Sequence, residues 1–584
     1  MKLLDALNKA LASAFEKAGY DPASAQVTLS NRPDLSDYQC NGALSLAKSC
    51  HKAPILIAEE IASNLAESGV FSDVSAVAPG FINLTVSPSF LAGFTSSMAL
   101  KGRFGVEEDP NAGKVIIDYG GPNVAKPLHI GHLRSAIIGE SIKRILRFKG
   151  AETIGDVHLG DWGTPIGLII EELKMRKPDL CYFDPSFSGP YPSEAPFTIA
   201  ELEEIYPAAS ARSKEDEGFR QNALKNTLLL QNGDPAMAAL WKHIITISVA
   251  DLKKNYARLN VSFELWKAES DADPYIRPMI DKMISDGVAH ISEGALVVDV
   301  SEPGDRREVP PCLIRKSDGA SLYATTDLAT IVWRMQDYHP DRMIYLADKR
   351  QEMHYTQFFR AARKAGLVEK DTGLTFIGFG TMNGKDGKPF KTRSGGVMRL
   401  EALISEIEDA VREKMAGRYD LDEDSEDIVH KVAIAAIKYG DLSNQAYKDY
   451  NFDIERFASF EGNTGPYILY NIVRIKSIME KSDEAPAEDL SGLPLDAPGM
   501  KALLMKLALF PDVIDEAYAE LAPHKICQFL HELSDAFSSF YHDTPILKES
   551  DEKKRKSLMR LLALVRDVLG TAIHLIGFEA PDRM

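Results

Sequence analysis

Residues 114–160 contain the pattern that most restricts how this chain can fold. A short β-branched run, KVIIDYG, begins at Lys114 and predicts a buried strand. A turn with Gly and Pro follows, then a helical pattern from about 131 to 149, and then a second strand-like run, ETIGDVHLG. Strand, helix and strand at this spacing form a βαβ unit, which places both strands parallel in one sheet. An α/β domain with a parallel sheet therefore begins near Lys114.

The remaining patterns divide the 584 residues into several domains around this unit. Strand-like runs return at 294–300, 312–318, 342–348 and 374–380, and we assign all four to the same parallel-sheet domain. The fold class expected is multidomain α/β. Its parts are an N-terminal α+β domain (1–108), a Rossmann-like parallel-sheet domain (109–400) with an insertion around 175–245, connecting helices (401–448) and an all-α C-terminal domain (449–584).

Composition excludes several classes of protein. The sequence is 45% hydrophobic and 26% charged with a net charge of −18, as in ordinary globular proteins. Its five cysteines are scattered and match neither a disulfide framework nor a CxxC zinc pattern. Apolar runs such as VAIAAI (432–437) are far shorter than the roughly 18 residues of a membrane span. We expect a cytoplasmic protein without a membrane segment, whose acidic balance still permits one basic face for nucleic acid.

A pair of histidines at the start of the predicted helix is the first chemical signal. In PNVAKPLHIGHLRSAIIGE, His129 and His132 are three residues apart, and Gly131 lets a ligand approach the backbone. A helix start directs free N–H groups and a positive dipole end at an anion, and Lys126 adds a full charge. The pair could instead be zinc ligands or helix caps, but no nearby residue completes a zinc set. The pattern favours a phosphate site.

The HIGH tetrapeptide is a signature of class I aminoacyl-tRNA synthetases, and its flanks are more specific. The string IDYGGPNVAKPLHIGHLRSAIIGESIKRILRFKG, followed by VHLGDWGTPIG, closely resembles arginyl-tRNA synthetase. Further blocks that resemble this family are DYQCNGALSLAK, GFINLTV, YARLNVSFELWKAES, KSDGASLYATTDLA, DKRQEMHYTQFF, DYNFDIERFASFEGNTGPYILYN and LIGFEAPDRM. The resemblance implies a class I catalytic domain between an N-terminal domain that binds the D-loop side of tRNA and a helical domain that binds the anticodon.

The resemblance also implies a nucleotide-binding loop after the last strand. GKDGKPFKTRSGG (384–396) occupies the place of the family's KMSKS loop, although alone it reads as a flexible basic hairpin. Phe390 and Arg393 stand where that motif has lysines, and Lys126 is placed to compensate. The catalytic residues implied are Lys126, His129, His132, Lys391 and Arg393. The ATP-binding residues implied are Lys126, His129, Gly131, His132, Thr381, Met382 and Lys391.

Recognition of arginine requires carboxylates and in-plane acceptors for its guanidinium group. The residues that match the family's arginine-binding positions are Asp118, Asn123, His129, Tyr323, Asp327 and Gln351. Tyr323, Asp327 and Gln351 are expected at the guanidinium end, and Asp118 and Asn123 at the α-ammonium end. Without the resemblance, Asp118 could be only a helix N-cap, and Tyr323 with Asp327 a surface pair one helical turn apart.

Four further residues are candidates for contact with tRNA. Asn83 matches a family position that reads the D-loop, although an Asn in a strand can equally accept a local hydrogen bond. In GPYILYNIVRIKS, Tyr467, Tyr470 and Arg474 follow one another at helical spacing. Aromatic and guanidinium planes stack on splayed RNA bases, so this face could receive an anticodon. Packing of the two tyrosines in the core is the competing interpretation.

The expected activity is arginyl-tRNA synthesis. Arginine would react with Mg²⁺-ATP to give arginyl-adenylate and pyrophosphate, and the arginyl group would pass to the 3′ end of tRNA(Arg) with release of AMP. We expect a monomer with no structural metal. Three alternatives remain open: a class I synthetase for another amino acid, a catalytically silent tRNA-binding protein on the same scaffold, and a plain nucleotidyltransferase.

Overall fold

The computed structural model describes residues 2–126, 128–316, 323–384, 386–388, 398–416, 425–482 and 485–584. The chain forms two compact units, each considered separately below. The first unit comprises Met1–Asp109, Glu413–Ser443 and Arg456–Met584, and the second comprises Pro110–Arg412 and Asn444–Glu455. Among the described helices, none combines the length and the apolar character that crossing a membrane requires.

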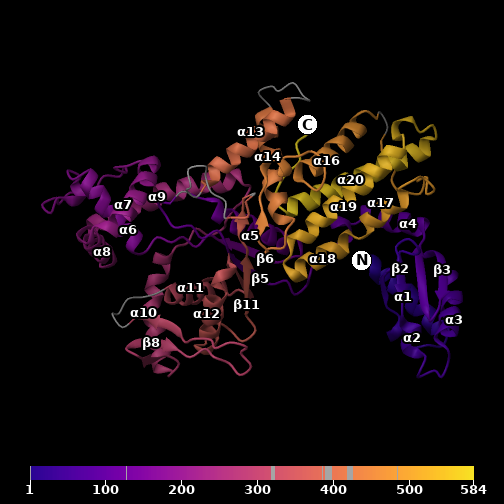
Figure 1. Ribbon diagram of the computed structural model, residues 1–584, viewed down its shortest axis with the longest axis horizontal. Helices are drawn as coiled ribbons and strands as arrows, with labels where there is room; N and C mark the ends of the chain where they lie inside the picture. Colours follow the sequence, from indigo (N-terminus) through magenta and orange to yellow (C-terminus); the bar gives the residue numbers. More distant parts are fainter. Residues whose placement is uncertain are drawn as a thin grey trace. The chain divides into compact units, whose positions relative to one another are not determined.

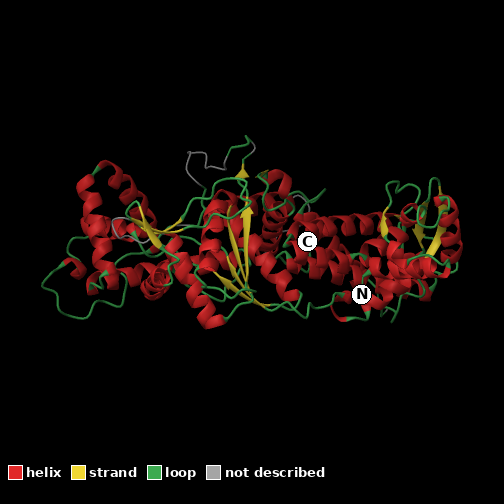
Figure 2. Ribbon diagram, turned by 90° about the horizontal axis from the view of Figure 1, so that it is seen from below, coloured by secondary structure: helices red, strands yellow, loops and turns green. Residues whose placement is uncertain are grey.

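A parallel sheet of four strands organises the second unit (Figures 1 and 2). Its strands are β5 (Lys114–Asp118), β6 (Glu152–Asp156), β10 (Arg342–Asp348) and β11 (Gly373–Phe379). They lie in the order β11-β10-β5-β6, and every neighbouring pair is parallel. The helix α5 (Ile130–Phe148) connects β5 to β6, which confirms the βαβ unit expected from the sequence. Strand order reverses between β5 and β10, and at such a reversal open α/β sheets have a crevice at the carboxyl ends of their strands, where ligands bind.

Two of the strand-like runs do not join this sheet. β8 (Ala295–Val298) and β9 (Cys312–Arg315) form a separate antiparallel sheet with β7 (His290–Ser292), within the same compact unit as the parallel sheet. The reason is local. Glu293 and Gly294 both have positive φ, 50° and 81°, and two such residues between strands make the tight turn of an antiparallel hairpin.

The helices of the second unit form two groups, one packed against the sheets and one at the left of Figure 1. Buried side chains of α10 (Glu269–Ser285), α11 (Tyr323–Tyr338) and α12 (Glu352–Lys364) form one core with β8, β9 and β10. The expected insertion contains α7 (Ile199–Glu215), α8 (Glu217–Gln231) and the start of α9 (Pro235–Arg258), and α6 (Thr164–Arg176) precedes it. The remaining elements are β12 (Met382–Asn383), α13 (Leu400–Ala416), β13 (Tyr450–Asn451) and α15 (Ile454–Phe457).

The first unit combines a small antiparallel sheet with a set of long helices. The sheet has the order β1-β2-β4-β3, and its strands are β1 (Val27–Leu29), β2 (Tyr38–Cys40), β3 (Phe71–Val77) and β4 (Phe81–Val86). The helices near the N-terminus are α1 (Leu3–Lys17), α2 (Gly42–Leu46), α3 (Pro54–Ala66) and α4 (Pro88–Ala99). Later in the chain are α14 (Ser425–Leu442), α16 (Gly465–Glu480), α17 (Met500–Ala508), α18 (Phe510–Glu520), α19 (Pro523–Asp543) and α20 (Glu552–Leu575).

Candidate functional site

The two histidines lie where α5 begins, next to the crevice at the carboxyl end of β5. His129 is the N-cap residue of α5, and its Nδ1 accepts the backbone N–H of Gly131 at 3.0 Å. The Nδ1 of His132 accepts the backbone N–H of His129 at 3.2 Å, and the two ring centroids are 3.9 Å apart. Because each Nδ1 is an acceptor, the neutral rings carry their proton on Nε2. The pair therefore caps the helix and also presents two N–H donors.

Burial keeps both histidines neutral. It lowers the pKa of His129, and it lowers the pKa of His132 to about 3, in each case with help from the positive charge of Lys126. Gly131 between them is exposed, and a Cβ there would lie 2.8 Å from Cε1 of His129. The start of α5 thus offers backbone and imidazole donors, with one nearby ammonium group, to an anion.

A second segment lies directly against the histidine pair. The backbone N–H of Ile130 donates to Met398 at 3.1 Å, and the N–H of Leu400 donates to Leu128 at 2.8 Å. His129 and Arg399 are consequently paired as in an antiparallel sheet. Residues 398–400 are therefore held against the start of α5. They follow the segment 384–396, which the sequence analysis assigned to the place of the KMSKS loop and most of which lies outside the described residues. Lys391 and Arg393, two of the expected catalytic residues, lie outside the described residues.

Thr381 and Met382 lie just beyond the carboxyl end of β11, at the same edge of the sheet as the histidines. The backbone N–H of Thr381 donates to Asp449 at 2.6 Å, and Met382 is buried in β12. Arg134 of α5 donates to the carbonyl of Gly380 at 2.7 Å. The segment that follows β11 is therefore held by α5 and by Asp449, next to the candidate nucleotide site.

Asp118 at the end of β5 is held by an arginine that the sequence did not reveal. Arg334 of α11 is fully buried, and its Nη2 donates to Asp118 and to Asp156 at 2.6 Å each. Burial raises the pKa of Asp118, whereas the charge of Arg334 opposes this shift. Asn123, the partner expected at the same end, is half-buried and is paired with Gly160 beyond the end of β6. A Cβ on Gly160 would lie 2.0 Å from Oδ1 of Asn123.

The residues expected at the guanidinium end lie at the start of α11 and after β10. Tyr323 is 76% exposed, Gln351 is exposed, and Asp327 is half-buried. His354, which sequence reasoning missed, contacts Asp327 through Nε2 at 2.7 Å. Burial raises the pKa of the neighbouring Tyr355, and the charges of Asp118 and Asp327 raise it further. Asp118 and Asp327, which are expected at opposite ends of the arginine site, thus both act on the pKa of Tyr355.

Further carboxyl groups that the sequence analysis did not select lie around the same crevice. Burial raises the pKa of Glu269 to about 7, and the charges of Asp161 and Asp327 contribute to the shift. Burial likewise raises the pKa of Asp161 to about 6, although Ser270 donates to it through its backbone N–H and its hydroxyl. Asp161 and Glu269 lie in VHLGDWGTPIG and YARLNVSFELWKAES, two blocks that resemble the family, so their acidic side chains were the signal present in the sequence. Together these groups make the crevice suited to a cation.

One arrangement in the crevice resembles a metal site. Ligand atoms of Asp118, Asp156 and His158 lie within 4.8 Å of one another. Both carboxylates, however, already accept hydrogen bonds from Arg334. A guanidinium between two carboxylates supplies the positive charge that a metal ion would bring. The donor set therefore does not fit a resident metal.

The candidate tRNA residues occur in two parts of the first unit. Asn83 is half-buried in the middle of β4, opposite Gln39 of β2 and Ser75 of β3. On α16, Tyr467 donates its hydroxyl hydrogen to Asp535 at 2.8 Å. Tyr470 instead lies beneath the guanidinium of Arg474, 4.4 Å from the ring centroid. Tyr467 is therefore anchored between helices, whereas Tyr470 and Arg474 form a stacked pair.

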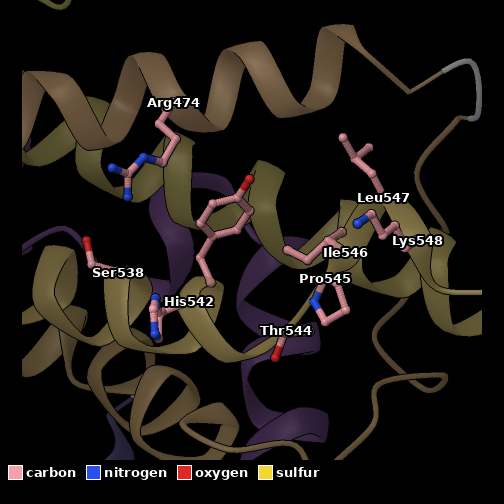
Figure 3. Close-up of a pocket in the computed structure, with 9 residues that line it drawn as sticks. Arg474, Ser538, His542, Thr544, Pro545, Ile546, Leu547 and Lys548 are labelled. Carbon is pink, nitrogen blue, oxygen red and sulfur yellow. The ribbon is translucent and has the colours of Figure 1, made fainter.

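Arg474 also lines a pocket with a volume of about 540 Å³ (Figure 3). Figure 3 shows Arg474 on one helix and Ser538 and His542 on another. Arg474 lies 5.8 Å from the ring of Tyr541, a residue that sequence reasoning missed. The remaining lining residues are Thr544, Pro545, Ile546, Leu547 and Lys548. A flat cation beside a tyrosine and a lysine suits an aromatic base that carries a phosphate.

Comparison with known proteins adds evidence of a different kind. Residues 95–454 match the family model "tRNA synthetases class I (R), catalytic domain", residues 468–584 match "DALR anticodon binding domain", and residues 1–86 match "Arginyl tRNA synthetase N terminal domain". The chain is 56% identical to the arginine–tRNA ligase of Agathobacter rectalis and 50% identical to that of Alkaliphilus oremlandii, and each comparison covers 100% of both chains.

Solved structures agree on the fold. The arginyl-tRNA synthetase of Plasmodium falciparum superposes with a TM-score of 0.80 at 25% identity, and the comparison covers 100% of both chains. The arginyl-tRNA synthetase of Thermus thermophilus gives a TM-score of 0.77 at 23% identity, again over 100% of both chains. The arrangement of a parallel-sheet catalytic domain with N-terminal and helical C-terminal parts is therefore shared with these proteins.

Proposed function

The chain belongs to the arginyl-tRNA synthetases, and from this premise we propose that it forms arginyl-adenylate in the crevice between β5 and β10. The observation that carries the proposal is the juxtaposition at this one edge. A helix start with two neutral histidine donors, fit for phosphate, follows the strand β5, which ends at Asp118, one of the carboxylates expected to bind arginine. The arginyl group is then transferred from the adenylate to a hydroxyl at the 3′ end of tRNA(Arg), and AMP is the leaving group.

The first step needs placement and charge neutralisation rather than a general base. The carboxylate of arginine attacks the α-phosphorus of ATP, a P–O bond forms, and pyrophosphate leaves with the electrons of the bond that breaks. The Nε2–H groups of His129 and His132 donate to phosphate oxygens, and Gly131 leaves room for the nucleotide. Lys126 neutralises developing charge, together with Lys391 and Arg393. Mg²⁺ carried by ATP supplies further positive charge when bound.

Arginine is oriented by its two ends. Asp327 accepts hydrogen bonds from the guanidinium group, with Tyr323 and Gln351 beside it. At the other end, Asp118 and Asn123 hold the α-ammonium group, and His129 lies between this group and the phosphates. Loss of a buried polar contact penalises amino acids without a guanidinium strongly, so binding alone can provide the required specificity.

The regions outside the crevice bind tRNA(Arg). Residues 1–108 contact the D-loop side through Asn83, and residues 449–584 receive the anticodon in the pocket beside Arg474, with Tyr467 and Tyr470 nearby. Residues 109–400 form the catalytic domain and 401–448 connect it to the anticodon-binding domain. We further propose that the protein acts as a cytoplasmic monomer.

Aminoacylation of purified tRNA tests the proposal. With ATP and each of the twenty amino acids in turn, only arginine should become attached, and only to tRNA(Arg). Attachment of a different amino acid would identify a class I synthetase of other specificity. Absence of ATP turnover with any amino acid would indicate a tRNA-binding protein that is catalytically silent. Adenylate formation without transfer to any tRNA would favour a plain nucleotidyltransferase.

A further inference from the structure

The insertion contacts the candidate nucleotide site at two points, through one face of α7. Nζ of Lys126 lies 4.7 Å from the centroid of the Tyr206 ring. One turn earlier on α7, Glu203 forms a salt bridge of 2.7 Å with Arg399. Lys126 precedes α5, and Arg399 is paired with His129. The two residues of α7 therefore hold both segments that meet at the start of α5.

The contact between Lys126 and Tyr206 is suited to a lysine that must act on phosphates. An aromatic face attracts an ammonium group without neutralising its charge, unlike a carboxylate. In the part of the chain that the structure describes, Lys126 forms no salt bridge with a carboxylate. Its charge still acts on both histidines, because it contributes to the lowered pKa of His129 and of His132. The ring thus holds Lys126 beside the site while its charge remains available.

Placement matters because a free lysine is a poor preorganised cation. Its four-carbon stem has many rotamers, and fixing them costs conformational entropy. Cations that are already in place when charge develops need no reorganisation during the reaction. The pair of Glu203 and Arg399 has one half-exposed partner, and surface pairs of this kind contribute little by themselves. We therefore expect Tyr206 to contribute more than Glu203 to the placement of Lys126.

We propose that Tyr206, supported by Glu203, is a positioning residue for adenylate formation that holds Lys126 next to the phosphate site at the start of α5. This inference rests on the proposed function, because it requires Lys126 to act on ATP. The insertion then supports adenylate formation through α7, the helix on which Tyr206 and Glu203 lie.

The test is arginine-dependent ATP–pyrophosphate exchange by the full chain with tRNA(Arg) present. Tyr206→Leu removes the ring and should lower kcat about 3- to 10-fold, the range expected for loss of one cation–π contact. The KM for ATP should change less than kcat, because the contact acts mainly on charge that develops in the transition state. Tyr206→Phe keeps the ring face and should stay within about twofold of the wild type.

A double-mutant cycle separates positioning from a structural effect. In a Lys126→Ala background, Tyr206→Leu should cause no further loss of kcat, because the group that it positions is gone. For the salt bridge, Glu203→Gln is compared with Glu204→Gln, the same charge change on the neighbouring residue, whose side chain is 76% exposed. Only Glu203→Gln should lower kcat, and by less than Tyr206→Leu does.

The outcomes distinguish this inference from the function on which it rests. If Lys126→Ala lowers kcat but Tyr206→Leu does not, the positioning role of Tyr206 is wrong. The same holds if Tyr206→Leu is equally damaging with and without Lys126, since the effect would then be structural. If Lys126→Ala itself leaves exchange unchanged, the proposed role of Lys126 fails, and the inference fails with it. Loss of kcat in Tyr206→Leu, its absence in Tyr206→Phe and its absence without Lys126 support the inference.

Discussion

Individual residues of the crevice have charge states that fit two different ligands. His129 and His132 are held neutral by burial and by Lys126, so they donate hydrogen bonds without adding charge. Glu269 has a raised pKa of about 7, because its carboxyl group is buried near other acidic groups. Binding of a guanidinium nearby would favour its ionised form. The neutral histidines therefore suit a nucleotide, and the acidic groups suit a cationic amino acid.

A pH dependence of arginine binding follows from Glu269. As the pH falls from 8 to 6, Glu269 gains a proton and the crevice loses a negative charge, while the guanidinium stays protonated. The KM for arginine should therefore rise as the pH falls, by about fivefold if the lost interaction is ~1 kcal/mol. Steady-state exchange across this range measures it. Glu269→Gln should give a high KM with little pH dependence, and an unchanged profile in that variant would exclude Glu269 as the cause.

How well single residues could be predicted depends on where their partners lie. His129, His132 and Asp118 belong to one continuous motif, so the sequence alone selected them. Arg334 and His354 were missed because their partners come from other elements. Arg334 is 216 residues from Asp118, and His354 is 27 residues from Asp327 and on a different helix. Only the strand order of the sheet brings such pairs together.

At the scale of single elements, the tripeptide His129–Gly131 at the start of α5 caps the helix, and we propose that it also contacts phosphate. The side chain of His129 caps the helix, and Gly131 leaves the space that the ring of His129 occupies. The strand and helix of this βαβ unit were predicted because their periodicity is local. The hairpin of β7 and β8 was not, because its sheet partner depends on the positive φ of Glu293 and Gly294.

Gly131→Ala tests this element. The new Cβ would lie 2.8 Å from Cε1 of His129, so the ring must move and the cap is lost. We expect kcat for exchange to fall at least about tenfold, because displacing the ring loses part of the roughly 100- to 1,000-fold effect of one preorganised donor. Stability should fall by ~1 kcal/mol from the lost cap. Gly570→Ala is the matched control, because it also lies in a helix and its Cβ would meet nothing within 4 Å. Normal exchange in Gly131→Ala would contradict the role of the His129 ring.

At the scale of the whole molecule, the candidate site is assembled from segments far apart in the sequence. Residues 128–130 are hydrogen-bonded to residues 398–400, and Asp327 near the start of α11 contacts His354 in the segment that follows β10. The sequence predicted the edge of the parallel sheet for this site, because the carboxyl ends of parallel strands share it. It could not predict which strands would be neighbours, since two of the six strand-like runs join a different sheet.

Adenylate formation should also depend on tRNA, as the resemblance to the family suggests. The basic, Gly-rich segment 384–396 lacks the usual lysine pattern, so an additional binding partner is needed to complete the nucleotide site. Arginine-dependent exchange should be detectable only when tRNA(Arg) is added, including tRNA(Arg) without a reactive terminal hydroxyl. Equal exchange without tRNA would refute this dependence but would not affect the assignment of arginine as the substrate.

The central claim is that the crevice between β5 and β10 binds arginine through Asp327 and activates it with ATP. The most direct measurement is exchange by Asp327→Asn, with arginine and ATP varied separately in the presence of tRNA(Arg). Loss of one charged hydrogen bond to a desolvated cation costs about 2–4 kcal/mol, which corresponds to a KM for arginine raised roughly 30- to 1,000-fold. The KM for ATP should change by less than about threefold. An unchanged KM for arginine would contradict the claim and remove Asp327 from the site.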